Sequence, residues 1–473
     1  MNNTDDNMSL MPFQHSLQSQ SAFAKLSGDF NPVHLDPVRA RRTMFGQVVT
    51  HGVHNVLCGL EEFLKNRTFS IKRLAVTFRN PVFLKEDVIV VPGNISDNSA
   101  LLNLQCEGTD TAEIRLECEA QKAPPAYFSL PVANFRRHPD NKTFAELKNA
   151  EGSFELRGDA KAINSTFPHS VRALGVDGVA RLLGLTRLVG MRCPGLHSLF
   201  SRFDVAFSEQ RSNEPTQYRV IHSDDRISMI TISVEGGGMT GTVNAFMRPP
   251  PVSQPGMTTV KSHVLGTPFK EMRALVIGGS RGLGEISAKI IAAGGGKTTI
   301  TYLSGKEDAN LVAEDISKVG GICKVMQMDV SEPTSAIQSL IQEDWWPTHL
   351  LYFATPRISS RPDEDNRDEF YNIYSDGLIK VVKALQNQSD EALTLFYPSS
   401  IYVVETPSNL TNYAAAKAKG ETTAENLAKD QPNLNVIIER LKPLATDQSA
   451  SLLNVDVAAP LETMVHLLTK RLC

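Results

Sequence analysis

The chain has 473 residues, which exceeds one ordinary hydrophobic core and predicts two to four domains of roughly 100–200 residues each. Hydrophobic residues make up 41% and charged residues 21%, proportions typical of a soluble globular protein. The formal net charge of −4 comes without a long basic block, so a nucleic-acid partner is not expected.

Neither a membrane span nor a secretion signal is indicated. Apolar runs fall short of the roughly 18 residues needed to cross a bilayer. The opening MNNTDDNMSLMPFQHS has acidic residues and no basic segment before an apolar stretch. The six cysteines lie far apart, without the paired spacing of a metal site or the density of a disulfide framework. We therefore expect a cytoplasmic protein with reduced thiols and no metal.

The first predicted domain covers residues 21–125. Residues 1–20 are polar and are predicted to form a loosely held tail. A helical region begins near Ser21, and runs of alternating, β-branched residues follow from position 71 to position 122, a pattern that indicates antiparallel strands. The polar-to-proline change at Ala123–Pro125 closes the block.

The second block, residues 126–247, repeats this order less clearly. Its centre, Ser170–Gly190, is apolar at helical spacing, and strand-like runs follow it. The prolines of RPPPVSQPG cannot continue a sheet ladder, so an extended linker is predicted over residues 248–268. Strands then alternate with helices over residues 269–473, which favours an α/β, doubly wound parallel sheet.

The most constrained motif is FAKLSGDFNPVHLDPVRA, at Phe23–Ala40. A carboxylate, Asp29, and an imidazole, His34, flank the turn-forming pair Asn31-Pro32. A tight turn there directs both side chains at one water molecule, as general acid–base chemistry requires. Taken singly, the aspartate could be a turn residue and the histidine a buried structural residue; only the whole motif favours catalysis.

This motif resembles the signature of MaoC-like (R)-specific enoyl-CoA hydratases, and FGQVVTHG resembles the family's entry into its long hot-dog helix. The resemblance implies that Asp29 and His34 add water to a trans-2-enoyl thioester to give the (3R)-hydroxyacyl product. Asn31 would orient this dyad through side-chain hydrogen bonds. The backbone N–H of Gly52, at the positive end of the next helix, would stabilise the developing enolate.

Several neighbouring polar residues are interpreted as structural. His51 and His54 are weaker candidates than the dyad. Three arginines are better explained as a solvated helix face than as a site for coenzyme A phosphates: Arg39, Arg41 and Arg42. Related hydratases pair a catalytic hot-dog unit with one that shapes the acyl tunnel, and residues 126–247 resemble that second unit because they contain no SGDxNPxH equivalent. His197 is interpreted as part of a strand-entry turn.

A glycine-rich turn, VIGGSRGLGE, follows a predicted strand and opens a predicted helix. Gly278, Gly282 and Gly284 have the spacing Gly-x-x-x-Gly-x-Gly, and the missing side chains let a pyrophosphate approach the backbone at the helix N-terminus. A glycine turn alone is weak support for nucleotide binding. Two further motifs accompany it, YPSS at Tyr397–Ser400 and YAAAK at Tyr413–Lys417.

Tyr413 and Lys417 are four residues apart and lie on one helix face. The ammonium is expected to lower the pKa of the phenol, making it a usable general acid or base near neutral pH. Together the three motifs resemble the short-chain dehydrogenase/reductase family, which implies a Rossmann-like fold and hydride transfer with a nicotinamide. Ser400 would position the substrate carbonyl or alcohol, with Ser399 the less favoured neighbour.

NADP(H) is the predicted cofactor, with NAD(H) less favoured. No acidic residue ends the second strand of this domain to hold a ribose 2′-hydroxyl, and Arg281 with Ser304 would instead meet a 2′-phosphate. Lys306 is interpreted either as a further phosphate contact or as a solvated loop charge. Asp329 resembles the family's adenine contact. The remaining predicted cofactor contacts are Gly278, Ser280, Gly282, Leu283, Gly284 and Lys417.

Local departures from the family pattern leave an alternative open. FATP at Phe353–Pro356 replaces Asn-Asn-Ala-Gly, Tyr374 (with Asn372 nearby) replaces a helical asparagine, and Ile277 replaces a threonine. The chain also ends soon after its sixth predicted strand. The alternatives are a silent nucleotide-binding domain, acting as sensor or oligomerisation module, and a reductase for a non-thioester substrate.

The combined prediction is an α+β double hot-dog followed by an α/β Rossmann-like, doubly wound parallel sheet. The predicted function is bifunctional: (R)-specific hydration and dehydration of enoyl thioesters, with NADP(H)-dependent interconversion of 3-oxoacyl and (3R)-hydroxyacyl thioesters. The substrate is expected to be carried on coenzyme A or on acyl carrier protein. Neither a nucleic acid nor a membrane is an expected partner. A homodimer is expected, because members of both families commonly associate.

Overall fold

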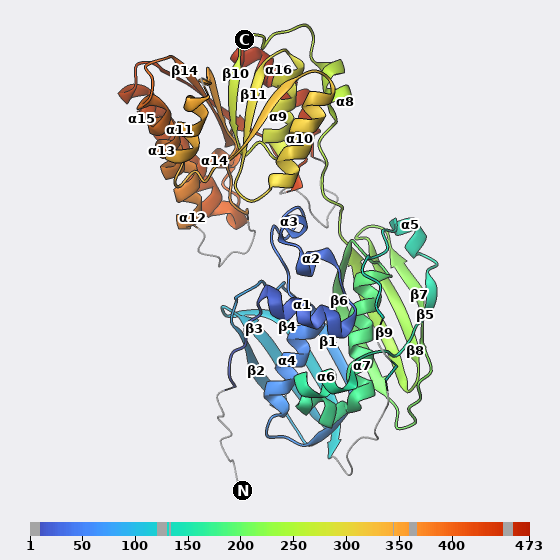
Figure 1. The fold of residues 1–473 in the computed structure, drawn as a ribbon. Coiled ribbons are helices and arrows are strands. Elements are labelled where there is room, and N and C mark those ends of the chain that lie inside the picture. Colours follow the sequence, from blue (N-terminus) through green and yellow to red (C-terminus); the bar gives the residue numbers. More distant parts are fainter. Residues whose placement is uncertain (1–9, 121–129, 132–133, 344, 359–366, 448–456) are drawn as a thin grey trace. The chain divides into compact units, whose positions relative to one another are not determined.

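The computed structural model describes residues 10–120, 130–131, 134–343, 345–358, 367–447 and 457–473. The chain divides between Pro250 and Pro251 into two compact units. We call the described residues up to Pro250 unit 1 and those from Pro251 onward unit 2, and describe each by itself (Figure 1). No helix among the described residues is long and apolar enough to cross a membrane.

Unit 1 is built on one nine-stranded antiparallel sheet in the order β2-β3-β4-β1-β6-β9-β8-β7-β5. Burial alternates along these strands, as in β3, because one face packs on the core and the other meets solvent. The strands are β1 (Phe69–Phe78), β2 (Val88–Ile95), β3 (Ser99–Cys106), β4 (Thr109–Ala120), β5 (Glu151–Phe154), β6 (Ser198–Phe207), β7 (Thr216–Asp224), β8 (Met229–Gly236) and β9 (Met239–Met247).

Strands β1 and β6 join the two halves of this sheet, with Arg73 opposite Ala206 and Thr77 opposite Arg202. Helices α4 and α7 contact each other and lie across one face of the sheet (Figure 1). One hydrophobic core extends through both halves. The helices are α1 (Leu17–Ser27), α2 (Pro32–Leu35), α3 (Pro37–Ala40), α4 (Gly52–Leu64), α5 (Phe144–Leu147), α6 (Ala160–Thr166) and α7 (Pro168–Met191).

The predicted tail over residues 1–20 is wrong for its later part. Phe13 forms a β-bridge with Val88, and Ser16 caps helix α1 by accepting the backbone N–H of Ser19. Gln20 is fully buried. The segment was predicted to be a tail because it is polar. Two of its polar residues instead have structural roles: Ser16 caps α1, and Gln20 makes hydrogen bonds inside the unit. Residues 1–9 and the predicted break at Ala123–Pro125 lie outside the described residues.

Unit 2 confirms the predicted doubly wound parallel sheet, in the strand order β12-β11-β10-β13-β14-β15. The strand order reverses between β10 and β13: strands β11 and β12 extend the sheet on one side of β10, and β13 to β15 extend it on the other. Ligands of such sheets bind beside this point, at the carboxyl ends of the strands. The strands are β10 (Arg273–Ile277), β11 (Lys297–Tyr302), β12 (Ile322–Gln327), β13 (His349–Tyr352), β14 (Leu393–Ser400) and β15 (Leu434–Leu441).

Two hydrophobic cores lie on the two faces of this sheet, one beneath α8, α9 and α16 and the other beneath α11, α13 and α15. The helices of unit 2 are α8 (Met257–His263), α9 (Gly282–Ala293), α10 (Lys306–Lys318), α11 (Thr334–Gln342), α12 (Arg367–Tyr371), α13 (Leu378–Gln386), α14 (Tyr402–Glu405), α15 (Thr411–Asp430) and α16 (Pro460–Leu472). A π-helical turn, Asn372–Gly377, joins α12 to α13, and a 3₁₀ turn, Ser408–Leu410, precedes α15.

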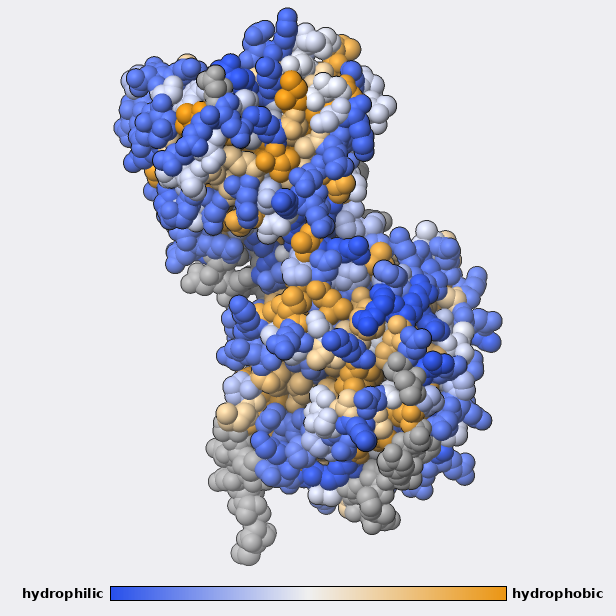
Figure 2. Space-filling model, in the orientation of Figure 1, coloured by the Kyte–Doolittle hydropathy of each residue, from blue (hydrophilic) through white to orange (hydrophobic). Residues whose placement is uncertain are grey.

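The predicted extended linker over residues 248–268 is wrong for its second half. Helix α8 occupies Met257–His263, and it buries Met257 and Val260 against the core of unit 2. These residues stand at helical spacing, a short signal that the neighbouring prolines obscured. On the face shown in Figure 2, hydrophilic side chains predominate and hydrophobic ones reach the surface in small groups, as is normal for folded proteins.

Candidate active sites

A short turn in unit 1 brings Asp29 and His34 together. Helix α1 ends at Ser27, and Gly28 reverses the chain in a left-handed conformation (φ 79°) that favours glycine. Asn31 then caps α2 by accepting the backbone N–H of Val33, with Pro32 in the first helical position. Polar side-chain atoms of Asp29, His34 and His51 consequently lie within 4.8 Å of one another.

The carboxylate of Asp29 is buried against helix α7, with 1% of the residue exposed. Thr186 donates a hydrogen bond of 2.7 Å from Oγ1 to Oδ2, and the backbone N–H of Asn31 donates to Oδ1 at 3.2 Å. Burial raises the pKa of Asp29, while the charge of His34 and the Thr186 hydrogen bond oppose part of that rise. A Cβ at Gly190 would lie 2.2 Å from Oδ1, so only glycine fits at that turn of α7.

His34 has one ring nitrogen committed to the backbone. Its Nδ1 lies 2.7 Å from the carbonyl oxygen of Val49, an acceptor, so Nδ1 carries the proton in the neutral ring and Nε2 keeps a lone pair. Burial lowers the pKa of His34, and Asp29 opposes part of that change. The neutral ring therefore has the tautomer that a general base needs.

Asn31 acts differently from the sequence prediction. Its side-chain amide donates to the carbonyl oxygens of Gly190 (2.9 Å) and Gly195 (3.1 Å) rather than to either dyad side chain. Only its backbone N–H contacts Asp29. The residue thus fixes the catalytic turn on the end of α7, and orients the dyad through the backbone.

Gly52 is the first residue of α4, where a backbone N–H has no acceptor within the helix. A Cβ at this position would lie 2.7 Å from the ring of Phe78, which explains the need for glycine. The position matches the sequence expectation of an N–H at the positive end of a helix.

His51, interpreted from sequence as structural, lies inside the site. Its Nε2 stands 3.1 Å from the main-chain oxygen of Asp29 and 4.0 Å from Oδ2. Its Nδ1 stands 2.6 Å from Oε1 of Gln20, an oxygen that also accepts the backbone N–H of His51. Burial and the neighbouring His34 and His54 hold the pKa of His51 well below its ordinary value. The two oxygens thus compete for the single ring proton of a neutral imidazole.

The other three predictions near this turn have simple outcomes. His54 is buried and accepts from Gln20 at 3.1 Å, in keeping with a structural role. The side chain of Arg39 is 69% exposed and pairs with Asp36 at 3.5 Å, as expected of a solvated face. Arg41 and Arg42 are half-buried, so the predicted solvated face holds for Arg39 alone. His197 is buried near the start of β6. Thr186 and Gly190 had no local signal in the sequence, since both lie far along the chain from the motif.

The glycine-rich turn of unit 2 links β10 to α9 as predicted. Gly278 (φ 75°) and Gly282 (φ 59°) take conformations that favour glycine. A Cβ at Gly284 would lie 2.3 Å from the carbonyl oxygen of Gly278, so this glycine permits the close packing of turn and helix. The space beside Gly282 is open, with the nearest atom 3.7 Å from an added Cβ, on Thr446. The glycines and the open space beside Gly282 at the N-terminus of α9 fit a pyrophosphate.

The remaining cofactor candidates surround the carboxyl ends of β10, β11 and β12. Ser280 lies in the turn and is buried, and Leu283 lies in the first turn of α9 and is half-buried. Arg281 precedes α9 and lies 3.6 Å from the carboxylate of Asp447. Ser304 follows β11 and is exposed. Asp329 follows β12, and its carboxylate accepts the backbone N–H of Ser331 at 2.8 Å. Hydrogen bonds from the side chain and then the backbone of Ser331 lower the pKa of Asp329.

Ser400, Tyr413 and Lys417 come together where β14 ends beside α15. A hydrogen bond with Ser400 lowers the pKa of Tyr413, but burial dominates and raises it to about 12. Lys417 donates to the carbonyl oxygen of Pro398 at 2.8 Å, and burial lowers its pKa to about 7. The expected lowering of the pKa of Tyr413 by Lys417 is thus not found, because the ammonium is directed at a carbonyl oxygen and the phenol is buried.

Tyr374 and the FATP segment, the two departures from the family pattern, contact each other. The hydroxyl of Tyr374 lies 2.5 Å from Oγ1 of Thr355, and the ring lies 4.1 Å from the ammonium of Lys417. Ser399 donates to Glu421, which also pairs with Arg440. This use of Ser399 in a structural network favours Ser400 as the hydroxyl that faces the substrate.

Comparison with known proteins matches a segment of each unit to a family. Residues 9–98 match the MaoC like domain, and residues 272–454 match the short chain dehydrogenase family. An (R)-specific enoyl-CoA hydratase of Aeromonas caviae is 37% identical over 71 residues, which are 14% of this chain and 53% of that protein. The chain therefore spans about half the length of that curated relative.

Solved structures resemble unit 2. A short chain dehydrogenase from Burkholderia cenocepacia J2315 in complex with NADP is 24% identical, with a TM-score of 0.39, over 42% of this chain and 89% of that one. A dehydrogenase/reductase from Sinorhizobium meliloti 1021 is 19% identical, with a TM-score of 0.37, over 45% and 90% of the two chains.

The two matches define a hydratase-type domain followed by an oxidoreductase-type domain. The chain contains a MaoC-like domain at its N-terminus, homologous to an (R)-specific enoyl-CoA hydratase, and a short-chain dehydrogenase domain at its C-terminus.

Proposed function

We propose that the protein is a bifunctional acyl-thioester enzyme. Unit 1 hydrates trans-2-enoyl thioesters to (3R)-hydroxyacyl thioesters and catalyses the reverse dehydration, while unit 2 interconverts 3-oxoacyl and (3R)-hydroxyacyl thioesters with NADP(H). The observation that carries the proposal is the approach of Asp29 and His34 to within 4.8 Å, on a turn that matches the MaoC-like domain. Acyl-CoA and acyl carrier protein thioesters are both candidate substrates.

The hydration step uses the dyad as a proton pair. One member removes a proton from water as its oxygen adds to C3, and the other delivers a proton to C2. Burial raises the pKa of Asp29 and lowers that of His34, so burial favours the neutral form of each group. The thioester oxygen gains negative charge during the step, and the N–H of Gly52, the first residue of α4, would donate to it.

The double hot-dog prediction is retained as part of this proposal. Each half of the sheet has one long helix, α4 or α7, across its face, and strands β1 and β6 join the halves. The sequence of the second half contains no equivalent of the SGDxNPxH motif that carries Asp29 and His34. It contributes Thr186 and Gly190 to the surroundings of Asp29, which supports its role in shaping the acyl tunnel.

A nicotinamide cofactor fits the glycine turn of unit 2. Gly278, Gly282 and Gly284 would hold its pyrophosphate at α9, and Ser304 and Asp329 lie near the strand ends where the adenosine portion would bind. When bound, the group supplies or accepts a hydride. The chain's own residues do the rest: Ser400 orients the substrate oxygen, and Tyr413 exchanges a proton with it. NADP(H) remains our choice, because no acidic residue stands at the end of β11 and Arg281 lies in the glycine turn.

Unit 2 has a second candidate function, a nucleotide-binding module without turnover. Two observations favour it: the pKa of Tyr413 is raised to about 12, and Tyr374 replaces the usual asparagine and contacts Thr355. A homodimer also stays a proposal, and size-exclusion chromatography with light scattering tests it.

Two assays on the purified chain test the main proposal. Hydration of crotonyl-CoA is followed by loss of enoyl absorbance, and reduction of acetoacetyl-CoA by oxidation of NADPH. We expect both activities, with Asp29→Asn removing only the first and Tyr413→Phe only the second. Tight NADPH binding without oxidation across a panel of 3-oxoacyl thioesters would establish the silent module instead.

A further inference from the structure

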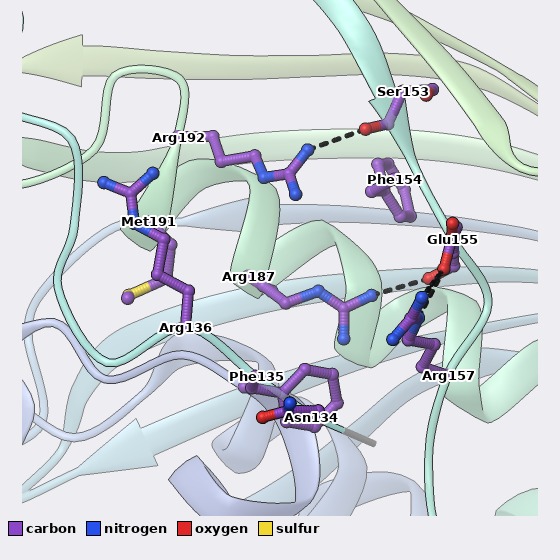
Figure 3. Close-up of a pocket in the computed structure, with 11 residues that line it drawn as sticks. Asn134, Phe135, Arg136, Ser153, Phe154, Glu155, Arg157, Arg187, Met191 and Arg192 are labelled. Atoms are coloured by element: carbon purple, nitrogen blue, oxygen red, sulfur yellow. Dashed lines mark hydrogen bonds and ion pairs between the residues drawn. The ribbon is translucent and has the colours of Figure 1, made fainter. Parts of the chain in front are cut away.

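A cavity of about 430 Å³ in unit 1 is lined by four arginines (Figure 3). Arg187 and Arg192 come from the C-terminal end of α7 and the residue after it. Arg157 follows β5, and Arg136 belongs to the segment before α5. Glu155 is the single acidic residue among the lining side chains. The cavity therefore carries an excess of positive charge.

Two of these guanidinium groups are paired with carboxylates, and two are not. Arg136 lies 2.5 Å from Asp140, and Arg157 pairs with Glu155. Arg187 donates to the main-chain oxygens of Ser27 (3.1 Å) and Glu155 (2.9 Å), and Arg192 to that of Ser153 (2.7 Å). Within the part of the chain that the structure describes, neither Arg187 nor Arg192 has a carboxylate at ion-pair distance.

This arrangement is costly for the protein alone. Burial, together with repulsion from Arg192 and Arg157, lowers the pKa of Arg187 to about 10, although the charges of Asp29 and Glu155 oppose part of that change. The guanidinium of Arg187 is nevertheless held in place, stacked 4.6 Å from the ring centre of Phe135. Arg187 is half-buried and Arg192 is exposed. A half-buried cation that is fixed by packing and has no carboxylate at ion-pair distance gains from any oxyanion that reaches it.

We propose that this cavity is a binding site for an oxyanionic group, a phosphate or a carboxylate, held by Arg187 and Arg192. The planar guanidinium presents paired N–H donors that match two oxygens of such a group. The lining also includes Met191 and Gly28, which are neighbours in sequence of Gly190 and Asp29. The anion has two possible sources, a free ion or an anionic group on the thioester substrate itself.

Occupancy of the cavity acts on the dyad, an inference that rests on the proposed hydratase function. The charge of Arg187 contributes to lowering the pKa of Asp29, and Arg187 also bonds to the carbonyl oxygen of Ser27 in the same turn. An anion beside Arg187 cancels part of that positive field. The limb of the hydration pH profile that Asp29 controls then moves to higher pH.

Calorimetric titration of the full chain with inorganic phosphate, succinate and coenzyme A tests the binding, with no need for turnover. Arg192→Gln removes one guanidinium from the cavity. Arg226→Gln is the matched control, since that side chain is 87% exposed and pairs with Asp224 elsewhere in unit 1. We expect Arg192→Gln to weaken binding of at least one probe tenfold or more, and Arg226→Gln to leave all three unchanged.

The pattern of the response identifies the source of the anion. Equal weakening of phosphate and coenzyme A, with competition between them, assigns the site to the carrier of the substrate. Weakening of phosphate or succinate alone assigns it to a free ion or to a carboxylated acyl group. Unchanged affinity for all three probes in Arg192→Gln, and also in Arg187→Lys, with unfolding temperatures equal to wild type, overturns the proposal. Crotonyl-CoA hydration by these variants separates that failure from failure of the proposed hydratase.

Discussion

The hydroxyl of Thr186 donates a 2.7 Å hydrogen bond to the carboxylate of Asp29, across 157 positions of sequence. Helix α7, which carries Thr186, belongs to the half of unit 1 that lacks the dyad motif. The candidate acid–base site is therefore assembled from both halves of the sheet, although the motif that identifies it lies in only one.

Replacing either dyad residue is expected to remove hydration selectively. Asp29→Asn and His34→Ala each remove a group that exchanges a proton with substrate, and such groups contribute on the order of 10²–10⁴-fold in rate. The measurement is initial loss of crotonyl-CoA absorbance. NADPH oxidation in the same samples controls for folding of unit 2, and a wild-type hydration rate in Asp29→Asn would contradict the assigned roles.

Thr186→Val is expected to move the pH profile of hydration. The hydrogen bond from Thr186 opposes the raised pKa of Asp29, so its loss raises that pKa further, and the limb of the profile that Asp29 controls shifts to higher pH. Thr186→Ser keeps the donor and serves as the matched control. If the two variants share one profile, the hydrogen bond has no influence on the titration of the site.

Gly190→Ala is expected to displace the carboxylate of Asp29, because the new Cβ would lie 2.2 Å from Oδ1. Overpacking of a filled interior costs about 1–3 kcal/mol, so the free energy of unfolding of unit 1 falls along with hydration. Denaturant unfolding and the crotonyl-CoA assay measure the two effects. Wild-type hydration together with wild-type stability in Gly190→Ala would contradict this prediction.

Lys417 is expected to make unit 2 more stable as the pH rises from 7 toward 10. The pKa of this lysine is about 7 in the folded chain and near 10.5 when unfolded, so between these values the unfolded chain binds the extra proton and folding is disfavoured at the lower pH. Thermal unfolding across this range measures the slope, and Lys417→Met should flatten it. Above pH 10 the trend reverses, because the raised pKa of Tyr413 favours unfolding there.

The sequence predicted most of what lies close together along the chain. The dyad turn, the glycine turn and the pair Tyr413–Lys417 are short motifs whose geometry depends on a few local residues. Helix periodicity and strand alternation likewise identified the parallel sheet of unit 2. These features are local, so the backbone rules of turns and helices were sufficient.

What the sequence did not predict depends on contacts between distant segments. Thr186 and Gly190 reach Asp29 only because α7 packs beside the turn, and Gln20 reaches His51 only because α1 crosses the start of α4. The raised pKa of Tyr413 has the same origin, since burial depends on the whole surrounding fold. The spacing of residues within one segment does not predict which distant segments it will contact or how deeply its side chains will be buried.

The pairing of β1 with β6 determines the smallest fragment of unit 1 that we expect to fold without the rest of the chain. Cutting the chain after β4 would leave β1 with an unpaired edge of backbone N–H and C=O groups and would expose the side of α4 that α7 covers. Bare edges of this kind attract other strands, and the product is aggregation. A truncated hydratase should accordingly run to Pro250, even though the motif that marks it is complete by Gly52.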